Sequence, residues 1–396
     1  MHQPFHAQLQ AQLDAMRAKG TLKTLRHLSG PMDAVVPMEG HGEVIILSSN
    51  NYLGLANHPE VIAAGRQALS DFGAGTASVR FICGTFTEHR TLETLLAKTF
   101  QFEASLSYVS CWAANTGVIP TLLTDQDAIV SDALNHASII DGVRMARQAE
   151  RKIYKHADMA DLEAQLKSVA AKRFKLVITD GVFSMEGDLC PLPEIVTLAE
   201  KYGAAVMVDD SHGTGVVGKT GRGVIEHYGL EGKVDILTST LGKALGGAAG
   251  GFAASSSAAV EMLTQASRPM LFSNALPVTI AASAGKAVDV MLREPQRVQK
   301  LRDNTKYMRE GLKGLGFKPL DGESAIVPII VGATEFAIQM SNELLKEGVF
   351  VTGFGYPVVP EGTARVRVQM SAALEKTHLD QALAAFKTVG RRLKLI

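Results

Sequence analysis

Length, composition and charge place the chain among ordinary globular proteins. It has 396 residues, of which 46% are hydrophobic and 20% charged, and its 40 acidic residues balance its 40 basic residues. A chain of this length is too long to fold around one small hydrophobic core, which predicts two domains, one large and one small. Because there is no basic excess, neither nucleic acid nor an anionic membrane is expected as a main partner.

The cysteines and the hydropathy pattern predict a cytoplasmic protein. Cys83, Cys111 and Cys190 are far apart and form neither a CxxC pair nor a disulfide framework, as is typical of a reducing compartment. The polar N-terminus lacks the apolar centre of a signal peptide, and no apolar run reaches the roughly 18–20 residues of a spanning helix. We expect no metal site and no membrane contact.

The first segment predicts an N-terminal arm over residues 1–50. Leu9, Leu13 and Met16 recur at helical spacing, so residues 1–30 are expected to be helical and amphipathic. A short strand over residues 44–47 follows.

A large domain is predicted over residues 51–290, because apolar runs of strand length alternate there with helical patterns. Helices are expected over 159–170 and 193–202. This alternation favours an α/β fold with a mainly parallel sheet and helices on both faces. The expected strands cover residues 106–109, 128–130, 176–179, 205–208 and 235–237.

The last third of the chain predicts a smaller C-terminal α/β domain over residues 291–396. A helical stretch follows Pro277, and residues 290–316 are charged and helical. Strands are expected over residues 326–331, 349–353 and 364–369.

Polar clusters follow the expected strands of the large domain. Ligands of open parallel sheets bind at the carboxyl ends of the strands, so these clusters are expected to form one composite site. The clusters are Ser110-Cys111-Trp112, Ser131-Asp132, Asp180-Gly181, Asp209 and Ser239-Thr240.

Lys243 is the strongest single indication of chemistry. It stands among hydroxyl-bearing residues and glycines after an apolar run. A lysine that loses its proton there is a nucleophile toward carbonyls, and the nearby hydroxyls, Thr240 included, suit a phosphate. Asp209 ends another strand and could hold a ring nitrogen protonated, although one residue of register would select Asp210 instead. Together Lys243 and the carboxylate predict a pyridoxal 5′-phosphate (PLP) enzyme.

Further polar residues are weaker candidates when each is taken alone. His212 and Ser184 could bond the phenolic oxygen of the cofactor, and His136 could stack on its ring or cap a helix. Cys111 and Trp112 open an apolar helical run, where free backbone N–H groups suit a phosphate. Trp112 could equally be core packing.

Two other sequence patterns are weaker evidence of a functional site. Residues 213–218 match G-x-G-x-x-G, but a loop rather than a helix is expected next, which argues against a dinucleotide site and a nicotinamide oxidoreductase. Arg365 and Arg367 alternate on a strand and so point the same way, where one of them could clamp a carboxylate. The alternative for this pair is a solvated strand face.

Taken together, these segments resemble the α-oxoamine synthases, which are fold-type I PLP enzymes. The resemblance covers about residues 40–390 and implies a fold of the aspartate aminotransferase type. Its motifs are Ser49 to Gly54, Ser131 to Arg144, Asp180 to Asp188, Val208 to Gly215, Thr240 to Gly247 and Gly362 to Ala373.

The resemblance implies a role for each site residue. Lys243 would form the Schiff base and move protons, Asp209 would pair with the ring nitrogen, and His136 would stack on the ring and contact substrate. Ser184 and His212 would bond the phenolic oxygen. The phosphate would be held by the backbone of Cys111 and Trp112 with Thr240, and by Ser273 and Asn274 of the neighbouring subunit. Asn50 and Arg367 would bind the amino acid carboxylate. The catalytic candidates are therefore Lys243, His136, Asp209 and His212.

The implied activity is the condensation of glycine with acetyl-CoA, or the reverse cleavage in threonine breakdown, by a homodimer with shared sites. Residues 77–85 and 131–136 favour this branch. The alternatives are the branch that joins alanine to a pimeloyl thioester in biotin synthesis, and a promiscuous enzyme that accepts several acyl-CoA lengths. Leu374 departs from the histidine common in the family, which bears on substrate preference rather than on the chemistry.

Overall fold

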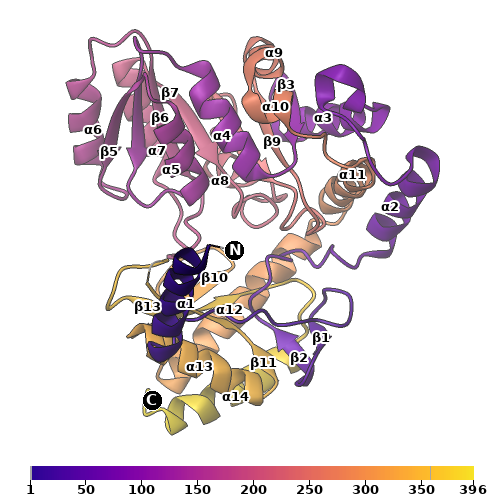
Figure 1. The fold of residues 1–396 in the computed structure, drawn as a ribbon, viewed down its shortest axis with the longest axis vertical. Coiled ribbons are helices and arrows are strands. Elements are labelled where there is room, and N and C mark those ends of the chain that lie inside the picture. The colour runs from indigo at the N-terminus through magenta and orange to yellow at the C-terminus, as the bar shows by residue number, and fades with distance from the viewer. Residues whose placement is uncertain (1, 357) are drawn as a thin grey trace. The chain divides into compact units, whose positions relative to one another are not determined.

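The computed structural model describes residues 2–356 and 358–396, which form two compact units (Figure 1). The larger unit is residues 50–302, and the smaller joins residues 1–49 to residues 303–396. These units divide the chain differently from the three expected segments 1–50, 51–290 and 291–396. The N-terminal segment does not stand alone, because β2 (Gly42–Ile46) pairs in parallel with β11 (Val349–Phe350). The second boundary falls inside α12 (Gln296–Leu315), since Arg302 still donates to the carbonyl of Gly218.

The larger unit is built on a seven-stranded, mainly parallel sheet, as expected. Its order is β3-β9-β8-β7-β6-β4-β5. The strands from β5 to β8 in this order run parallel, whereas β9 runs antiparallel between β3 and β8. The strands are β3 (Ala104–Tyr108), β4 (Ala128–Asp132), β5 (Glu150–Tyr154), β6 (Lys175–Asp180), β7 (Ala205–Asp209), β8 (Ile236–Thr240) and β9 (Gly251–Ser255).

Two of these strands were not expected, and both lack the usual apolar pattern. β5 is an edge strand that begins Glu150-Arg151-Lys152, where charged side chains protect the open edge. β9 reads Gly-Phe-Ala-Ala-Ser, and its small residues carry little strand propensity. Both strands are formed because neighbouring strands supply their hydrogen bonds.

The register of the central strands aligns their carboxyl ends. Asp180 pairs with Asp209 across β6 and β7, and Asp209 pairs with Thr238 across β7 and β8. Buried apolar residues of these strands, among them Ile178 and Met207, form the core beneath. The chain therefore brings its polar strand ends to one edge of the sheet.

Helices pack around this sheet (Figure 1). α4 contacts α5, α9 and α10, and α6 contacts α7. Several begin at side-chain caps: Ser110 accepts from the N–H of Ala113 and Asp158 from that of Asp161. The helices are α2 (Pro59–Phe72), α3 (Thr87–Phe100), α4 (Cys111–Leu122), α5 (Ala137–Met145), α6 (Met159–Ser168), α7 (Leu192–Tyr202), α8 (Val224–Tyr228), α9 (Ser257–Ala266), α10 (Arg268–Phe272) and α11 (Val278–Arg293), with a π-helical turn η1 (Arg80–Gly84).

The smaller unit holds two three-stranded sheets, β1-β2-β11 and β10-β13-β12. Its further elements are β1 (Val35–Met38), β10 (Ile326–Gly332), β12 (Thr352–Phe354), β13 (Ala364–Gln369), α13 (Thr334–Lys346) and α14 (Lys376–Arg392). The strand expected over 349–353 is two short strands, because β11 and β12 join different sheets.

The N-terminal helix is shorter than expected. α1 covers Gln3–Ala18 rather than residues 1–30, and Gly20 follows it at φ +65°, a conformation that ends helices. No side chain of α1 is buried within this chain. Within residues 2–356 and 358–396, no helix combines the length and the apolar character that crossing a membrane requires.

Candidate active site

A cavity of about 190 Å³ lies at the carboxyl ends of the parallel strands of the larger unit. Seven of the residues expected at a cofactor site line it: Cys111, Trp112, His136, Asp209, His212, Thr240 and Lys243. The other lining residues are Ser110, Ser138, Asp180, Val182 and Ser211.

Asp209 is buried at the cavity with its carboxylate held from both sides. Oδ1 accepts the backbone N–H of Ser211 at 2.9 Å. Oδ2 accepts the Asn115 side-chain amide at 2.6 Å, and the Cys111 thiol lies 3.5 Å from the same oxygen. Burial and the charge of Asp209 raise the pKa of that thiol well above its usual value, so Cys111 is a donor here rather than a nucleophile.

Asp210, the competing carboxylate, does not line the cavity. It accepts the backbone N–H of Val224 at 3.2 Å and is fully buried, which raises the pKa of its carboxyl. It also lies against Gly181, Gly213 and Gly223, where a Cβ on Gly223 would come within 1.6 Å of Oδ2. Consecutive strand residues point to opposite faces, so the register that directs Asp209 inward directs Asp210 away.

Asn115 was missed by the sequence reasoning. It is fully buried on α4, donates to both Asp209 and Ser138, and accepts from the Thr238 hydroxyl at 2.8 Å. The only sequence signal was a polar residue within the apolar run of α4. Its partners come from three separate segments, so only the tertiary structure shows that it orients Asp209.

His136 lies beside the cavity at the start of α5. Its Nδ1 accepts the backbone N–H of Ser138, which assigns the ring proton to Nε2, and its own backbone N–H donates to Asp180 Oδ2 at 2.9 Å. Its ring meets Trp112 edge-on at 6.1 Å. Burial lowers the pKa of His136 and outweighs the charge of Asp209, which raises it, while the charge of Lys243 adds to the lowering, so the imidazole is neutral near pH 7.

Asp180, at the end of β6, faces the same space. It is fully buried, and burial together with the charge of Asp209 raises the pKa of its carboxyl well above the usual value. Two carboxylates that converge on one cavity cannot both be charged at low cost, so the neutral form of Asp180 is favoured.

His212 is oriented by a residue from another motif. Its Nδ1 lies 2.8 Å from the hydroxyl of the fully buried Tyr52. Tyr52 belongs to the segment from Ser49 to Gly54 that was singled out in the sequence, although no role was assigned to it.

Lys243 stands in the loop between β8 and β9, flanked by the buried residues Leu241 and Ala244. Its charge acts on the titration of Cys111, His136 and Asp180, which places it electrostatically among them. The Thr240 hydroxyl accepts the N–H of Gly242 at 3.0 Å and so orders the start of this loop.

The start of α4 is suited to an anion. The first N–H groups of a helix have no partner within it, and here they belong to Cys111 and Trp112, which line the cavity. β9 approaches this turn so closely that a Cβ on Gly251 would lie 2.3 Å from the Cys111 nitrogen.

The remaining predicted residues do not line this cavity. Ser184 sits partly buried in a loop over residues 181–190. Ser273 is half-buried, and the exposed Asn274 forms an isolated bridge with Val79. Asn50 and Arg367 belong to different units. On β13, the Arg367 guanidinium lies 4.6 Å from the ring centre of Phe354 and donates to Gln369 at 2.9 Å.

The G-x-G-x-x-G segment forms no dinucleotide site in the described chain. Residues 213–218 form turns and bends with an isolated bridge at Thr214, and the next helix begins only at Val224. The loop expected there is confirmed.

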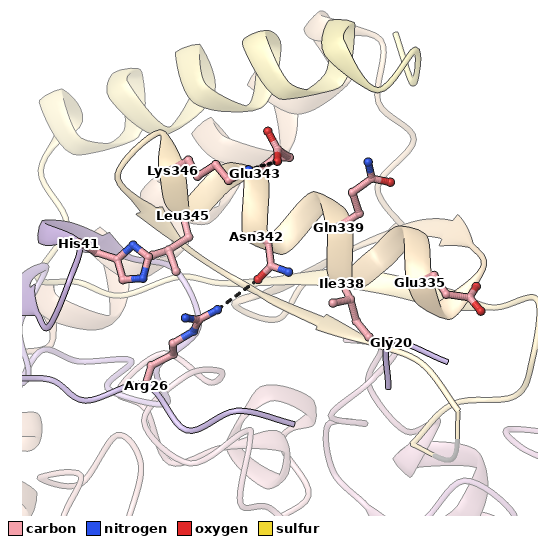
Figure 2. Close-up of a pocket in the computed structure, with 10 residues that line it drawn as sticks. All are labelled: Gly20, Arg26, His41, Glu335, Ile338, Gln339, Asn342, Glu343, Leu345 and Lys346. Atoms are coloured by element: carbon pink, nitrogen blue, oxygen red, sulfur yellow. Dashed lines mark hydrogen bonds and ion pairs between the residues drawn. The ribbon is translucent and has the colours of Figure 1, made fainter. Parts of the chain in front are cut away.

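A second hollow, of about 490 Å³, lies on the smaller unit (Figure 2). Figure 2 shows Arg26 directed at Asn342, to which it donates at 3.3 Å, while Lys346 pairs with Glu343. Lys346 and Arg392 both pair with Glu343, and none of the residues expected at the cofactor site lines this hollow, so it is the weaker candidate. Its lining is Gly20, Arg26, His41, Glu335, Ile338, Gln339, Asn342, Glu343, Leu345 and Lys346.

One group of described residues approaches the geometry of a metal site: His58, Glu60 and Glu294. Arg293 already pairs with both glutamates, at 2.5 and 3.1 Å. A cation would have to displace that guanidinium.

Comparison with known proteins identifies the protein family to which the chain belongs. The model of the family described as "Aminotransferase class I and II" matches residues 42–386. The chain belongs to this family, and the resemblance to α-oxoamine synthases seen in its motifs is confirmed.

Individual relatives span nearly the whole chain. A mitochondrial 2-amino-3-ketobutyrate coenzyme A ligase of Bos taurus is 46% identical over 97% of this chain and 91% of its own length. An 8-amino-7-oxononanoate synthase of Bacillus velezensis is 44% identical over 98% of both chains. Serine palmitoyltransferase from S. paucimobilis, solved with bound PLP and myriocin, superimposes with a TM-score of 0.93 at 32% identity over 98% of both chains. The fold-type I architecture expected from the sequence is confirmed.

Proposed function

We propose that the chain is a PLP-dependent C-acyltransferase that joins glycine to the acetyl group of acetyl-CoA, giving 2-amino-3-ketobutyrate and coenzyme A, or that runs the reverse cleavage. The observation that carries the proposal is one cavity lined by both Lys243 and the buried, doubly hydrogen-bonded Asp209. The bovine relative that is 46% identical bears the name of this activity.

The residues that line the cavity fit PLP. The α4 N-terminus and the Thr240 hydroxyl suit its phosphate, Asp209 suits a protonated ring nitrogen, and the flat ring of His136 suits a stacking position. When bound, PLP supplies an electron sink for a carbanion next to the amino group of the substrate.

The residues of the chain have distinct tasks in this reaction. The Lys243 amine binds the cofactor and then takes and returns the proton at Cα of glycine. Asp209 keeps the ring nitrogen protonated, and Asn115 keeps Asp209 in place. The neutral His136 adds no positive charge against the ring face. We assign His212, and Ser184 from its loop, to the phenolic oxygen.

Arg367 is proposed to bind the substrate carboxylate. Its guanidinium is buried on β13 and oriented by Phe354 and Gln369, which reduces the entropy lost on forming a paired contact. Asn50, at the start of the larger unit, is proposed to contact the amino acid as well.

A homodimer with shared sites is also proposed. Phe81, Ile82 and Phe272 are each more than 60% exposed, and the bridge between Val79 and Asn274 brings their two segments together. An exposed apolar patch of this kind suits a protein interface. Ser273 and Asn274 adjoin it, and they are assigned to the partner's phosphate. Sedimentation of a fully active monomer would contradict this assignment.

The second candidate function is condensation of alanine with a pimeloyl thioester, because the Bacillus velezensis relative, named for 8-amino-7-oxononanoate synthesis, is 44% identical over 98% of the chain. The deciding experiment is a panel of acyl-CoA chain lengths with glycine and with alanine, followed by release of free thiol. Each extra methylene is worth about 1–3 kcal/mol in an apolar pocket, so we expect kcat/KM to fall gradually from acetyl-CoA to longer chains. A maximum with alanine and pimeloyl-CoA would select the second candidate, and broad use of several lengths a promiscuous enzyme.

A cytoplasmic location and a role in threonine breakdown are proposals from the sequence. The bovine relative is named as mitochondrial, so the compartment needs its own localisation experiment.

A further inference from the structure

His156 lies between two carboxylates that are far apart in the sequence. Its Nδ1 is 3.0 Å from Asp132 Oδ1, and its Nε2 is 2.9 Å from Asp188 Oδ2. A carboxylate accepts hydrogen bonds, so both ring nitrogens must donate, which only the imidazolium does. The residue lies two positions after the end of β5 and was not among the candidates from the sequence.

The surroundings keep this ring charged. Burial by itself lowers the pKa of His156, but the hydrogen bonds and charges of Asp132 and Asp188 outweigh it and raise the pKa to about 10. The ring also meets the edge of Phe183, with centres 4.4 Å apart. His156 therefore carries its charge throughout the neutral range.

On one side, the bridge formed by Asp132, His156 and Asp188 holds the turn that leads to His136. Asp132 Oδ1 also accepts the N–H of Leu134 at 2.8 Å, and Oδ2 accepts that of Ala157 at 3.0 Å. The N–H of Asn135 donates to the Asp132 carbonyl. The orientation of the Asp132 carboxylate therefore sets the path of the chain over residues 132–136, just before the cavity.

On the other side, the bridge holds the loop that carries Ser184. Within residues 181–190, the N–H of Phe183 donates to the carbonyl of Asp188 at 3.0 Å and the N–H of Cys190 to that of Gly181 at 3.0 Å. Asp188 Oδ1 is buried with no hydrogen-bond partner among the described residues. The contact of Oδ2 with His156 therefore balances the charge of the Asp188 carboxylate.

We propose that His156 is a positioning residue that joins the 132–136 turn to the 181–190 loop and so sets His136 and Ser184 relative to each other. The inference rests on the proposed function for the roles of those two residues, but the junction itself does not depend on turnover. It predicts that a change at one histidine loosens two segments that are about fifty residues apart in the sequence.

Hydrogen exchange of the full-length protein tests the junction directly. His156→Gln has donors on a single nitrogen and cannot bond both carboxylates, so amides of both segments should exchange about tenfold faster. Asp188→Ala removes the acceptor for Nε2 but leaves the contact of His156 with Asp132, so only the 181–190 loop should loosen. His27→Gln is the matched control, because His27 forms an exposed pair with Glu39 and should change neither segment.

The outcomes separate this proposal from the proposed function. Loosening of a single segment in His156→Gln, or a uniform rise in exchange across the whole sheet, would overturn the junction. In cofactor-loaded enzyme, His156→Gln should weaken PLP retention about tenfold while His27→Gln does not. A protein that binds no PLP yet shows paired loosening would retain the junction and lose the proposed function.

Discussion

Two hollows among the described residues, the cavity at the carboxyl ends of the strands and the one on the smaller unit, differ in how their polar groups are used. The hollow on the smaller unit is the larger of the two, at about 490 Å³, but its lysine and one of its glutamates pair with each other (Figure 2). The cavity at the sheet edge holds about 190 Å³, and it collects two buried carboxylates, two histidines and a lysine on one space. Volume alone would select the wrong hollow, whereas convergent buried groups with shifted pKa values indicate chemistry.

Removing the lysine of the cavity should have the largest effect. Lys243→Ala deletes both the amine that binds the cofactor and the group that moves the Cα proton, so kcat should fall by about 10³-fold or more. Lys346→Ala, the matched change in the other hollow, should leave kcat unchanged. Steady-state thiol release measures both variants, and normal turnover of Lys243→Ala would refute the assignment of the cavity.

The next largest effect is expected at the adjacent carboxylates Asp209 and Asp210, whose Asn variants should differ in kcat. Asp209→Asn keeps the shape but cannot stabilise a protonated ring nitrogen as well, so kcat should fall by about 10²-fold. Asp210→Asn preserves an acceptor for the N–H of Val224 and should change kcat little. If Asp210→Asn proved the more damaging change in the same assay, the inward register of Asp209 would be wrong.

Asn115 should have a smaller effect that passes through Asp209. Asn115→Ala removes the 2.6 Å bond to Oδ2 without touching substrate, so kcat should fall about tenfold while the KM for glycine changes little. The absorbance of the bound cofactor as a function of pH should shift as well. Asn115→Asp is the companion variant, since a second carboxylate beside Asp209 should do more harm than the alanine does.

The smallest effect is expected in the pH dependence of stability. The pKa of His156 is raised from 6.5 to about 10, so its contribution is complete below pH 6.5 and is lost as the pH rises toward 10. Urea unfolding should show roughly 1–2 kcal/mol of such loss, since the side chain is partly exposed. His156→Gln should flatten this alkaline slope. An unchanged slope would mean that the bridge does not hold the proton.

The pKa of His136 is shifted in the opposite direction and offers an internal contrast. Because burial lowers it below 6.5, its contribution is present above pH 6.5 and is lost as the pH falls through the depressed value. His136 should therefore affect the acid limb of the same unfolding curve, and His156 the alkaline limb.

The sequence by itself determined the family, the parallel sheet and most of the cavity lining. Apolar strands followed by polar residues mark the carboxyl ends of parallel strands, and such ends must share one edge of a sheet. This physical constraint is why the sequence alone predicts that Lys243, Asp209, His136 and Thr240 share one site, and all four line the cavity. Short polar or small-residue strands such as β5 and β9 lack that pattern and were missed.

Only the tertiary structure identifies the residues that position the side chains of other residues. Asn115 contacts Asp209 across 94 residues of sequence, Tyr52 contacts His212 across 160, and His156 joins Asp132 to Asp188. No local spacing records such pairs, because their partners are set by sheet register and loop path. The choice between Asp209 and Asp210 has the same origin: one residue of register exchanges the faces of a strand, and only packing against Gly213 and Gly223 selects the face.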